Sequence, residues 1–283
     1  MSSPVNEPDP QPQPADPQHL PADPGVETTG VPAADLPRDA AHWAGKVSRL
    51  QAAAAPGRQG DNVSGRRLMG PVQGFGAMWQ KTYTVDIGSA ATPQEGVAAW
   101  KADFGKFWPK GNFFHGALTG IAPGDVALLD LSMPGGVRLS TGVMVLYADD
   151  ESFTLMTPQG HMFAGWITNS AEERDGSTVL QSQVLMRAND PLYEMGLMLG
   201  GHRKEDTFWH DTLEALALHL GVTGATHAKN LVCVDRHRQW RRAGNIWHNA
   251  AIRTVLHTLA RPFRAITRNR RRTAEAPGDE RTA

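Results

Sequence analysis

Apolar and polar residues alternate along much of residues 78–188, and this pattern predicts short β-strands. In MWQKTYTVDI, residues 78–87, the side chains of Trp79, Tyr83, Val85 and Ile87 fall on one side of the first strand. Turn signals such as Pro134-Gly135-Gly136 separate the strands expected at residues 125–133, 141–148, 152–156, 161–168 and 178–188. These connections are too short for parallel crossovers, so an antiparallel meander is predicted.

Helical patterns precede and follow this meander. One helix is predicted to begin at Thr92, where Pro93 and Glu95 complete a capping box. Its apolar face is expected to hold Val97, Trp100, Phe104 and Phe107. A longer helix is predicted from Asp190-Pro191 to about Leu220, with a kink at Gly200-Gly201. Residues 39–55 suggest a further short helix with Trp43, Val47 and Leu50 on one side, and the order of elements indicates an α+β protein.

The long helix carries three polar residues at intervals of four, namely His202, Asp206 and His210. At roughly 100° per residue they share one stripe of the helix. The same stripe holds the apolar residues expected to face the sheet, which are Leu192, Met195, Met198, Leu199, Trp209, Leu213, Leu216, Ala217 and Leu220. The three polar side chains are therefore predicted to point inward, where each needs a hydrogen-bond partner.

The order strand, helix, long antiparallel meander and long C-terminal helix resembles the START-like, or SRPBCC, helix-grip superfamily, in a bacterial branch. The resemblance covers about residues 76–222 and includes YADDESFTLMTPQGHMFAGW and RANDPLYEMGLMLGGHRKEDTFW. The superfamily contains polyketide cyclase-type, lipid-transfer and plant allergen-type domains. It implies a curved antiparallel sheet wrapped around the last helix, with an apolar cavity between them for a hydrophobic ligand. The second short helix usual in that superfamily is not evident here.

Three interpretations of the polar stripe remain open. Asp206 could accept hydrogen bonds from the histidines or from Arg187 in a structural network, or the three residues could form the polar end of an apolar pocket. A metal site would need His161 or His115 to converge on them, and neither a metal nor a cofactor is expected. The candidate ligand-binding residues are Trp108, His115, His161, Trp166, His202, Asp206, Trp209 and His210. For Trp108, His115, His161 and Trp166, packing in the core or at its rim is favoured.

Composition divides the chain into segments. Residues 1–38 hold ten of the twenty prolines and few large apolar side chains, which predicts a disordered leader before a short helix and linker at 39–75. There is no secretory signal pattern and no run of eighteen apolar residues, and the single cysteine, Cys233, excludes an intrachain disulfide. These features predict a cytoplasmic protein.

Charge separates the C-terminal part from the rest. Residues 227–272 contain twelve Lys and Arg against one acid, Asp235, although the whole chain carries a net charge of −1. A basic amphipathic helical tail is predicted over 227–272, followed by a disordered end at 273–283. Its expected contacts with an anionic membrane surface or a protein partner are Arg241, Arg242, Trp247, Arg253, Arg261 and Arg264. No groove-reading motif supports binding of nucleic acid.

Three functions are compatible with these patterns. The leading hypothesis is binding of a hydrophobic or aromatic small molecule, lipid-like or polyketide-like, between the sheet and the last helix. The second is a cyclase or aromatase-type enzyme in which a His–Asp pair transfers protons. The third is an interaction protein that presents its basic tail, which would make it peripheral at the membrane.

Overall fold

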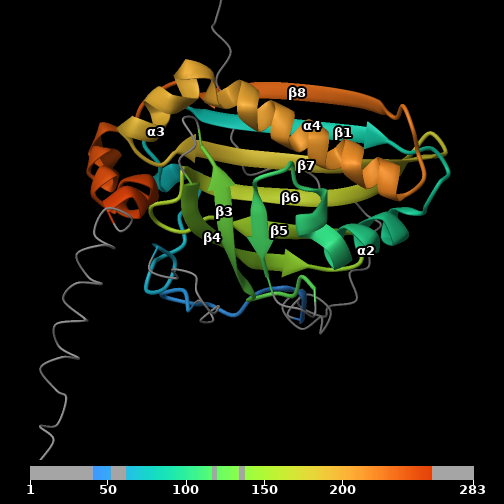
Figure 1. The fold of residues 1–283 in the computed structure, drawn as a ribbon, viewed down its shortest axis with the longest axis horizontal. Helices are drawn as coiled ribbons and strands as arrows, with labels where there is room; N and C mark the ends of the chain where they lie inside the picture. Colours follow the sequence, from blue (N-terminus) through green and yellow to red (C-terminus); the bar gives the residue numbers. More distant parts are fainter. Residues whose placement is uncertain (1–40, 52–61, 117–119, 134–137, 257–283) are drawn as a thin grey trace, which may run out of the picture. The chain divides into compact units, whose positions relative to one another are not determined.

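A large curved antiparallel sheet with helices on one face forms the protein, as the computed structural model shows (Figure 1). The structure describes residues 41–51, 62–116, 120–133 and 138–256. The eight strands lie in the order β2-β3-β4-β5-β6-β7-β1-β8. Their bounds are β1 (Met78–Asp86), β2 (Phe113–His115), β3 (Val126–Ser132), β4 (Arg138–Ala148), β5 (Ser152–Met156), β6 (Phe163–Arg174), β7 (Ser177–Ala188) and β8 (Thr226–Asp235).

Helix α2 (Pro93–Asp103) and helix α4 (His202–His219) cover the same face of the sheet (Figure 1). Helix α2 begins with the expected capping box, in which Thr92 and Glu95 exchange hydrogen bonds. It continues into a 3-10 helix, η4 (Phe104–Phe107). One core contains side chains from both helices and from the inward face of the strands, among them Trp100, Phe104, Phe153, Leu213 and Leu216. The predicted α+β class, the meander and the buried face of the first helix are therefore confirmed.

The outer face of the sheet is covered by the chain that precedes β1. Leu50 and Val63 pack there against Leu128 and Met144, which point away from the main core. Residues 43–51 are not helical, and Trp43 forms an isolated β-bridge with Tyr147. The predicted short helix is therefore absent from 43–51, and the described part of the predicted linker, residues 62–75, contributes buried side chains. Tertiary packing of its few apolar residues outweighs its Gly-rich and polar composition.

The kink predicted at Gly200-Gly201 is present and divides the last helix. Helix α3 (Pro191–Gly196) runs into a π-helical turn, η6 (Leu197–Gly201), in which Gly200 has φ +114°. After the kink, Leu213, Leu216 and Ala217 enter the core as expected. Before it, Met195, Met198 and Leu199 are exposed, so their predicted inward orientation is wrong. The change of direction at Gly200 breaks the regular 100° progression on which that prediction rested.

The basic helical tail predicted for 227–272 does not begin at residue 227. Residues 226–235 form β8, which pairs antiparallel with β1 along its whole length and extends the sheet beyond the expected domain end at 222. A 3-10 helix, η7 (Trp240–His248), and a helical stretch at 250–256 follow. Backbone pairing with the open edge of β1 accounts for this strand. The predicted leader, the disordered end, Arg261 and Arg264 lie outside the described residues.

Substitution of Gly200 by alanine tests the kink. The positive φ of Gly200 disfavours any Cβ, so Gly200→Ala should lower the free energy of unfolding by at least about 1 kcal/mol in urea denaturation. Gly196→Ala is the matched control, because Gly196 has helical φ −61° and open space for a Cβ. This control should be neutral or stabilising by up to about 1 kcal/mol. Equal effects of the two substitutions would contradict a fixed kink.

Candidate functional site

A buried lysine forms the centre of a polar cluster between β1 and α4. The side chain of Lys81 has no exposed surface, and its Nζ donates to Glu205 Oε2 at 2.8 Å and to Asp206 Oδ1 at 2.9 Å. An ammonium group removed from water is tolerated only with such partners. Lys81 lies on the inward face of β1 because it is two residues from both Trp79 and Tyr83, and side chains at this spacing share one face of a strand. Strand alternation in the sequence is sufficient to predict this position of Lys81.

Asp206 accepts hydrogen bonds from three side chains on different elements. Besides Lys81, Tyr83 Oη donates to Oδ1 at 2.7 Å and Lys229 Nζ on β8 donates to Oδ2 at 2.9 Å. Burial alone would raise the pKa of Asp206, but the hydrogen bonds from Lys229, Lys81 and Tyr83 outweigh it and lower the pKa to about 2. Asp206 is therefore a carboxylate at neutral pH.

Glu205 and His202 carry the unsatisfied polar atoms of this cluster. Burial raises the pKa of Glu205 to about 7 against the opposing effect of Lys81, and its Oε1 has no hydrogen-bond partner. Burial and the charge of Lys81 lower the pKa of His202 to about 4, and its Nδ1 also has no partner. The Nδ1 of His202 lies 4.0 Å from Glu205 Oε2. The cluster thus holds an ionised Asp206 beside a glutamate that titrates near neutral pH.

A pocket of about 370 Å³ opens to the surface above this cluster, between α4, β1 and β8. We call it the Asp206 pocket. Its lining comprises Tyr83, Thr84, Asp206, Thr207, His210, Leu213, His227, Ala228 and Lys229. At its rim the imidazole rings of His210 and His227 lie 4.3 Å apart between centroids, and His227 Nε2 is 2.7 Å from Glu214 Oε2. The pocket therefore combines an apolar wall with several hydrogen-bonding groups.

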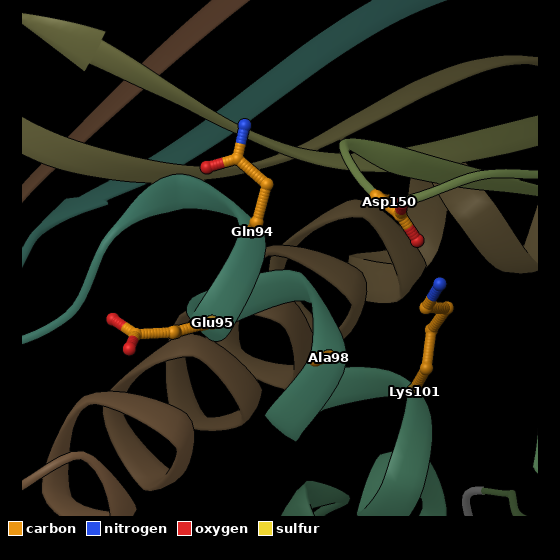
Figure 2. Close-up of a pocket in the computed structure, with 5 residues that line it drawn as sticks. All are labelled: Gln94, Glu95, Ala98, Lys101 and Asp150. Carbon is orange, nitrogen blue, oxygen red and sulfur yellow. The ribbon is translucent and has the colours of Figure 1, made fainter.

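A second pocket, of about 300 Å³, lies beside α2 (Figure 2). It is lined by Gln94, Glu95, Ala98, Lys101 and Asp150. Figure 2 shows Glu95 pointing away from Lys101 and Asp150. The Lys101 ammonium donates to the backbone oxygen of Asp149 at 2.6 Å. Because its polar groups do not converge, this pocket is a weaker candidate than the Asp206 pocket.

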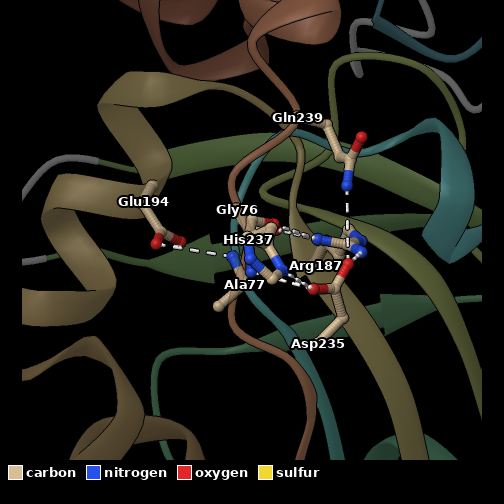
Figure 3. Close-up of polar contacts among 7 residues, drawn as sticks. All are labelled: Gly76, Ala77, Arg187, Glu194, Asp235, His237 and Gln239. Carbon is tan, nitrogen blue, oxygen red and sulfur yellow. Dashed lines mark hydrogen bonds and ion pairs between the residues drawn. The ribbon is translucent and has the colours of Figure 1, made fainter.

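A separate polar cluster around Arg187 is structural (Figure 3). Arg187 is buried and donates to the backbone oxygens of Gly76 at 2.5 Å and His237 at 2.8 Å, and it also pairs with Asp235. Its partner is thus Asp235 and not Asp206, which had been one of the open interpretations. The cluster fixes the start of the C-terminal segment to β7.

The structure gathers only part of the predicted site. Asp206 and His210 line the Asp206 pocket, and His202 lies beside its buried floor. His210 is exposed, however, so its predicted inward orientation is wrong. Lys81, Tyr83, Glu205, His227 and Lys229 were missed. No signal in the sequence placed His227 and Lys229 here, because strand β8 was not predicted.

The other predicted ligand-binding residues lie elsewhere. Trp108 and Trp209 pack against the main core, each edge-on to Phe208. His115 lies on β2, at the opposite edge of the sheet from β8, 3.5 Å from Asp130. His161 is buried in the turn before β6, where its Nδ1 accepts from the Phe163 amide. Trp166 is on the outer sheet face, because its neighbour Ile167 faces the main core.

This arrangement does not support the His–Asp pair of the enzyme hypothesis or the convergence of histidines that a metal site would need. Asp206 bonds to two lysines and a tyrosine rather than to either histidine, so the His–Asp pair of the enzyme hypothesis is not formed. His115 and His161 do not converge on His202. Within the described ranges, no three His, Cys, Asp or Glu side chains are placed to hold a metal ion, and no helix is long and apolar enough to span a membrane.

The expected apolar chamber between the sheet and the last helix is not one of the two pockets. Leu213, Leu216 and Ala217 of α4 are fully buried in the main core on this face of the sheet. Beside them, at α2 and η4, Phe153 meets Trp100 and Phe104 edge to face, with ring centroids 5.7 and 5.3 Å apart. Trp108 stacks edge-on against Phe104 and Phe114. The candidate site is consequently at the flank of α4, not beneath its centre.

Comparison with known proteins finds partial structural similarity at low sequence identity. No protein-family model and no curated protein matches the chain. Among solved structures, protein Ms6760 from Mycobacterium smegmatis is 15% identical, with a TM-score of 0.37 over 51% of this chain and 91% of that one. The di-domain ARO/CYC StfQ from the steffimycin biosynthetic pathway is 9% identical, with a TM-score of 0.40 over 52% of this chain and 53% of that one. Ara h 8.0201 is 14% identical, with a TM-score of 0.36 over 50% of this chain and 97% of that one.

The titration of Glu205 predicts a specific pH dependence of stability. Because its pKa in the folded protein, about 7, lies above its ordinary value of 4.5, the folded state binds more protons between these two values. The contribution of Glu205 is complete below pH 4.5 and is lost as the pH rises through 7. In urea denaturation from pH 4.5 to 8, the native protein should lose stability relative to Glu205→Gln, with a slope of at most about 1.4 kcal/mol per pH unit.

The control for this experiment is Glu172→Gln, an exposed position at the end of β6. It should keep the pH dependence of the native protein. Parallel stability profiles for the native protein and Glu205→Gln would show that the buried carboxyl does not titrate in this range.

Proposed function

We propose that the protein binds a small molecule in the Asp206 pocket, one with an apolar body and an oxygen-bearing end. The observation that carries this proposal is the convergence of α4, β1 and β8 on one opening above a buried charged cluster. Leu213 and the ring of Tyr83 offer an apolar wall. Pockets that pair such a wall with a few placed polar groups are the usual form of a ligand site.

The polar groups of the pocket favour a ligand that accepts hydrogen bonds. Asp206 already accepts from Lys81, Tyr83 and Lys229, so little of its accepting capacity remains for a ligand. Lys229 is about half exposed and retains further N–H donors, and the exposed Thr207 of α4 also lines the pocket. A carboxylate, phenolate or ketone oxygen suits this set better than an ammonium group.

A pair of tryptophan substitutions tests the location. Thr207→Trp, at an exposed position on α4, should fill the Asp206 pocket, whereas Ala98→Trp fills the pocket beside α2 by the same kind of change. In calorimetric titrations, 1-naphthoate should bind the native protein and Ala98→Trp equally and Thr207→Trp at least about tenfold more weakly. Loss of binding in both variants, or in neither, would place the ligand elsewhere.

The chemistry of the ligand is tested by comparing two probes of the same shape. The anion 1-naphthoate should bind the native protein more tightly than the cation 1-naphthylmethylammonium. Lys229→Met should reduce this preference, because it removes the exposed ammonium of the pocket. A native protein that prefers the cation would contradict the assignment of the polar end.

A further inference from the structure

Exposed apolar side chains gather where the last helices meet. On α3 and η6 they are Leu192, Met195, Met198 and Leu199, and on η7 they are Trp240 and Trp247. Leu199 is 80% exposed and Trp247 is 81% exposed. We call these six residues the α3–η7 surface. Large apolar side chains that gather on a surface mark a contact site more often than isolated ones do.

Specific contacts hold the two halves of this surface together. Arg238 Nε donates to Glu194 Oε1 at 3.0 Å, and its Nη2 lies 3.2 Å from the sulfur of Met198. Asn249 Nδ2 donates to the buried carboxylate of Asp190 at 2.8 Å. Figure 1 shows α3 and the following C-terminal helices side by side at one end of the sheet. The α3–η7 surface is therefore part of the folded unit and not a separate tail.

The kink at Gly200 accounts for the exposure of Met198 and Leu199. A regular continuation of α4 would have carried these side chains over the sheet, on the same stripe as Leu213 and Leu216. The positive φ of Gly200 instead turns the preceding helix away from the sheet. An exposed apolar face is thus built into the backbone at this point.

Positive charge flanks the α3–η7 surface. Arg203 and Lys204 follow the kink, and Arg236, Arg241 and Arg242 lie before and within η7, all of them exposed. The nearby carboxylates are neutralised, because Glu194 pairs with Arg238 and Asp235 pairs with Arg187. Beyond residue 256 the sequence adds six arginines before residue 273 and no acid. Charge complementarity therefore points to an anionic partner.

We propose that the α3–η7 surface binds an anionic membrane surface. Leucine and methionine side chains enter the acyl boundary, the tryptophans lie at the level of the headgroups, and the arginines contact lipid phosphates. Apolar and aromatic side chains framed by arginine are the pattern of peripheral membrane binding. This function is independent of the Asp206 pocket, which lies along α4 at β1 and β8.

Flotation of the full chain with lipid vesicles tests the proposal. Vesicles of phosphatidylcholine with phosphatidylserine should retain the protein, and vesicles of phosphatidylcholine alone should bind it at least about tenfold more weakly. Met198→Ser/Leu199→Ser should reduce binding to the anionic vesicles at least about tenfold. The control Val47→Ser/Leu218→Ser changes two exposed apolar residues outside the surface and should leave binding unaltered.

A second pair of variants tests the charges. Arg241→Gln/Arg242→Gln should weaken binding to anionic vesicles by about 30-fold at low salt, and added salt should reduce this difference. The control Lys106→Gln/Arg174→Gln removes two charges from other parts of the chain and should bind as the native protein does.

Three outcomes would overturn the proposal. One is absence of flotation with anionic vesicles, and another is equal binding by the surface variants and their controls. The third is a concentration-dependent dimer, seen by analytical ultracentrifugation, that Met198→Ser/Leu199→Ser abolishes without any effect on flotation. That result would assign the α3–η7 surface to contact between copies of the chain.

Discussion

The ammonium of Lys81 lies without solvent exposure between a sheet and a helix, and its two carboxylate partners are consecutive residues of α4. Removing a charge from water is costly unless its partners are held in place. Strand β1 and α4 are thereby fixed in one relative position, and β8 joins them because Lys229 contacts the same Asp206. The opening of the Asp206 pocket depends on this three-way junction, since each element supplies part of its wall.

The backbone conformation of Gly200 is the second constraint, because it separates a buried helical segment from an exposed one. After the glycine, α4 contributes Leu213 and Leu216 to the core and Asp206 to the charged cluster. Before it, α3 and η6 turn their apolar side chains outward beside the arginines of η7. One positive φ thus allows neighbouring stretches of a single apolar pattern to face opposite environments.

The candidate site was predictable only in part, for reasons that particular residues illustrate. Asp206 was identified because its spacing from His202 places it on the inward stripe of a regular helix. Lys81 was equally readable from strand alternation, whereas Lys229 and His227 lie in the polar first half of a strand that was not predicted. Histidine and tryptophan are common in binding sites, and His115 and Trp166 were proposed for that reason. His115 lies at the far edge of the sheet and Trp166 on its outer face, so both are away from the pocket.

Local rules in the sequence determined the elements themselves: the capping box of α2, the alternation of the strands, the kink at Gly200 and hence the α+β class. Only the tertiary structure decided that β8 pairs with β1, that aromatic rings of α2, η4 and β5 share one core with α4, and that charged groups meet at the flank of α4. The physical reason is that periodicity reports the short-range geometry of one element. Edge pairing, close packing of side chains and the solvation of a buried charge depend on residues far apart in the chain.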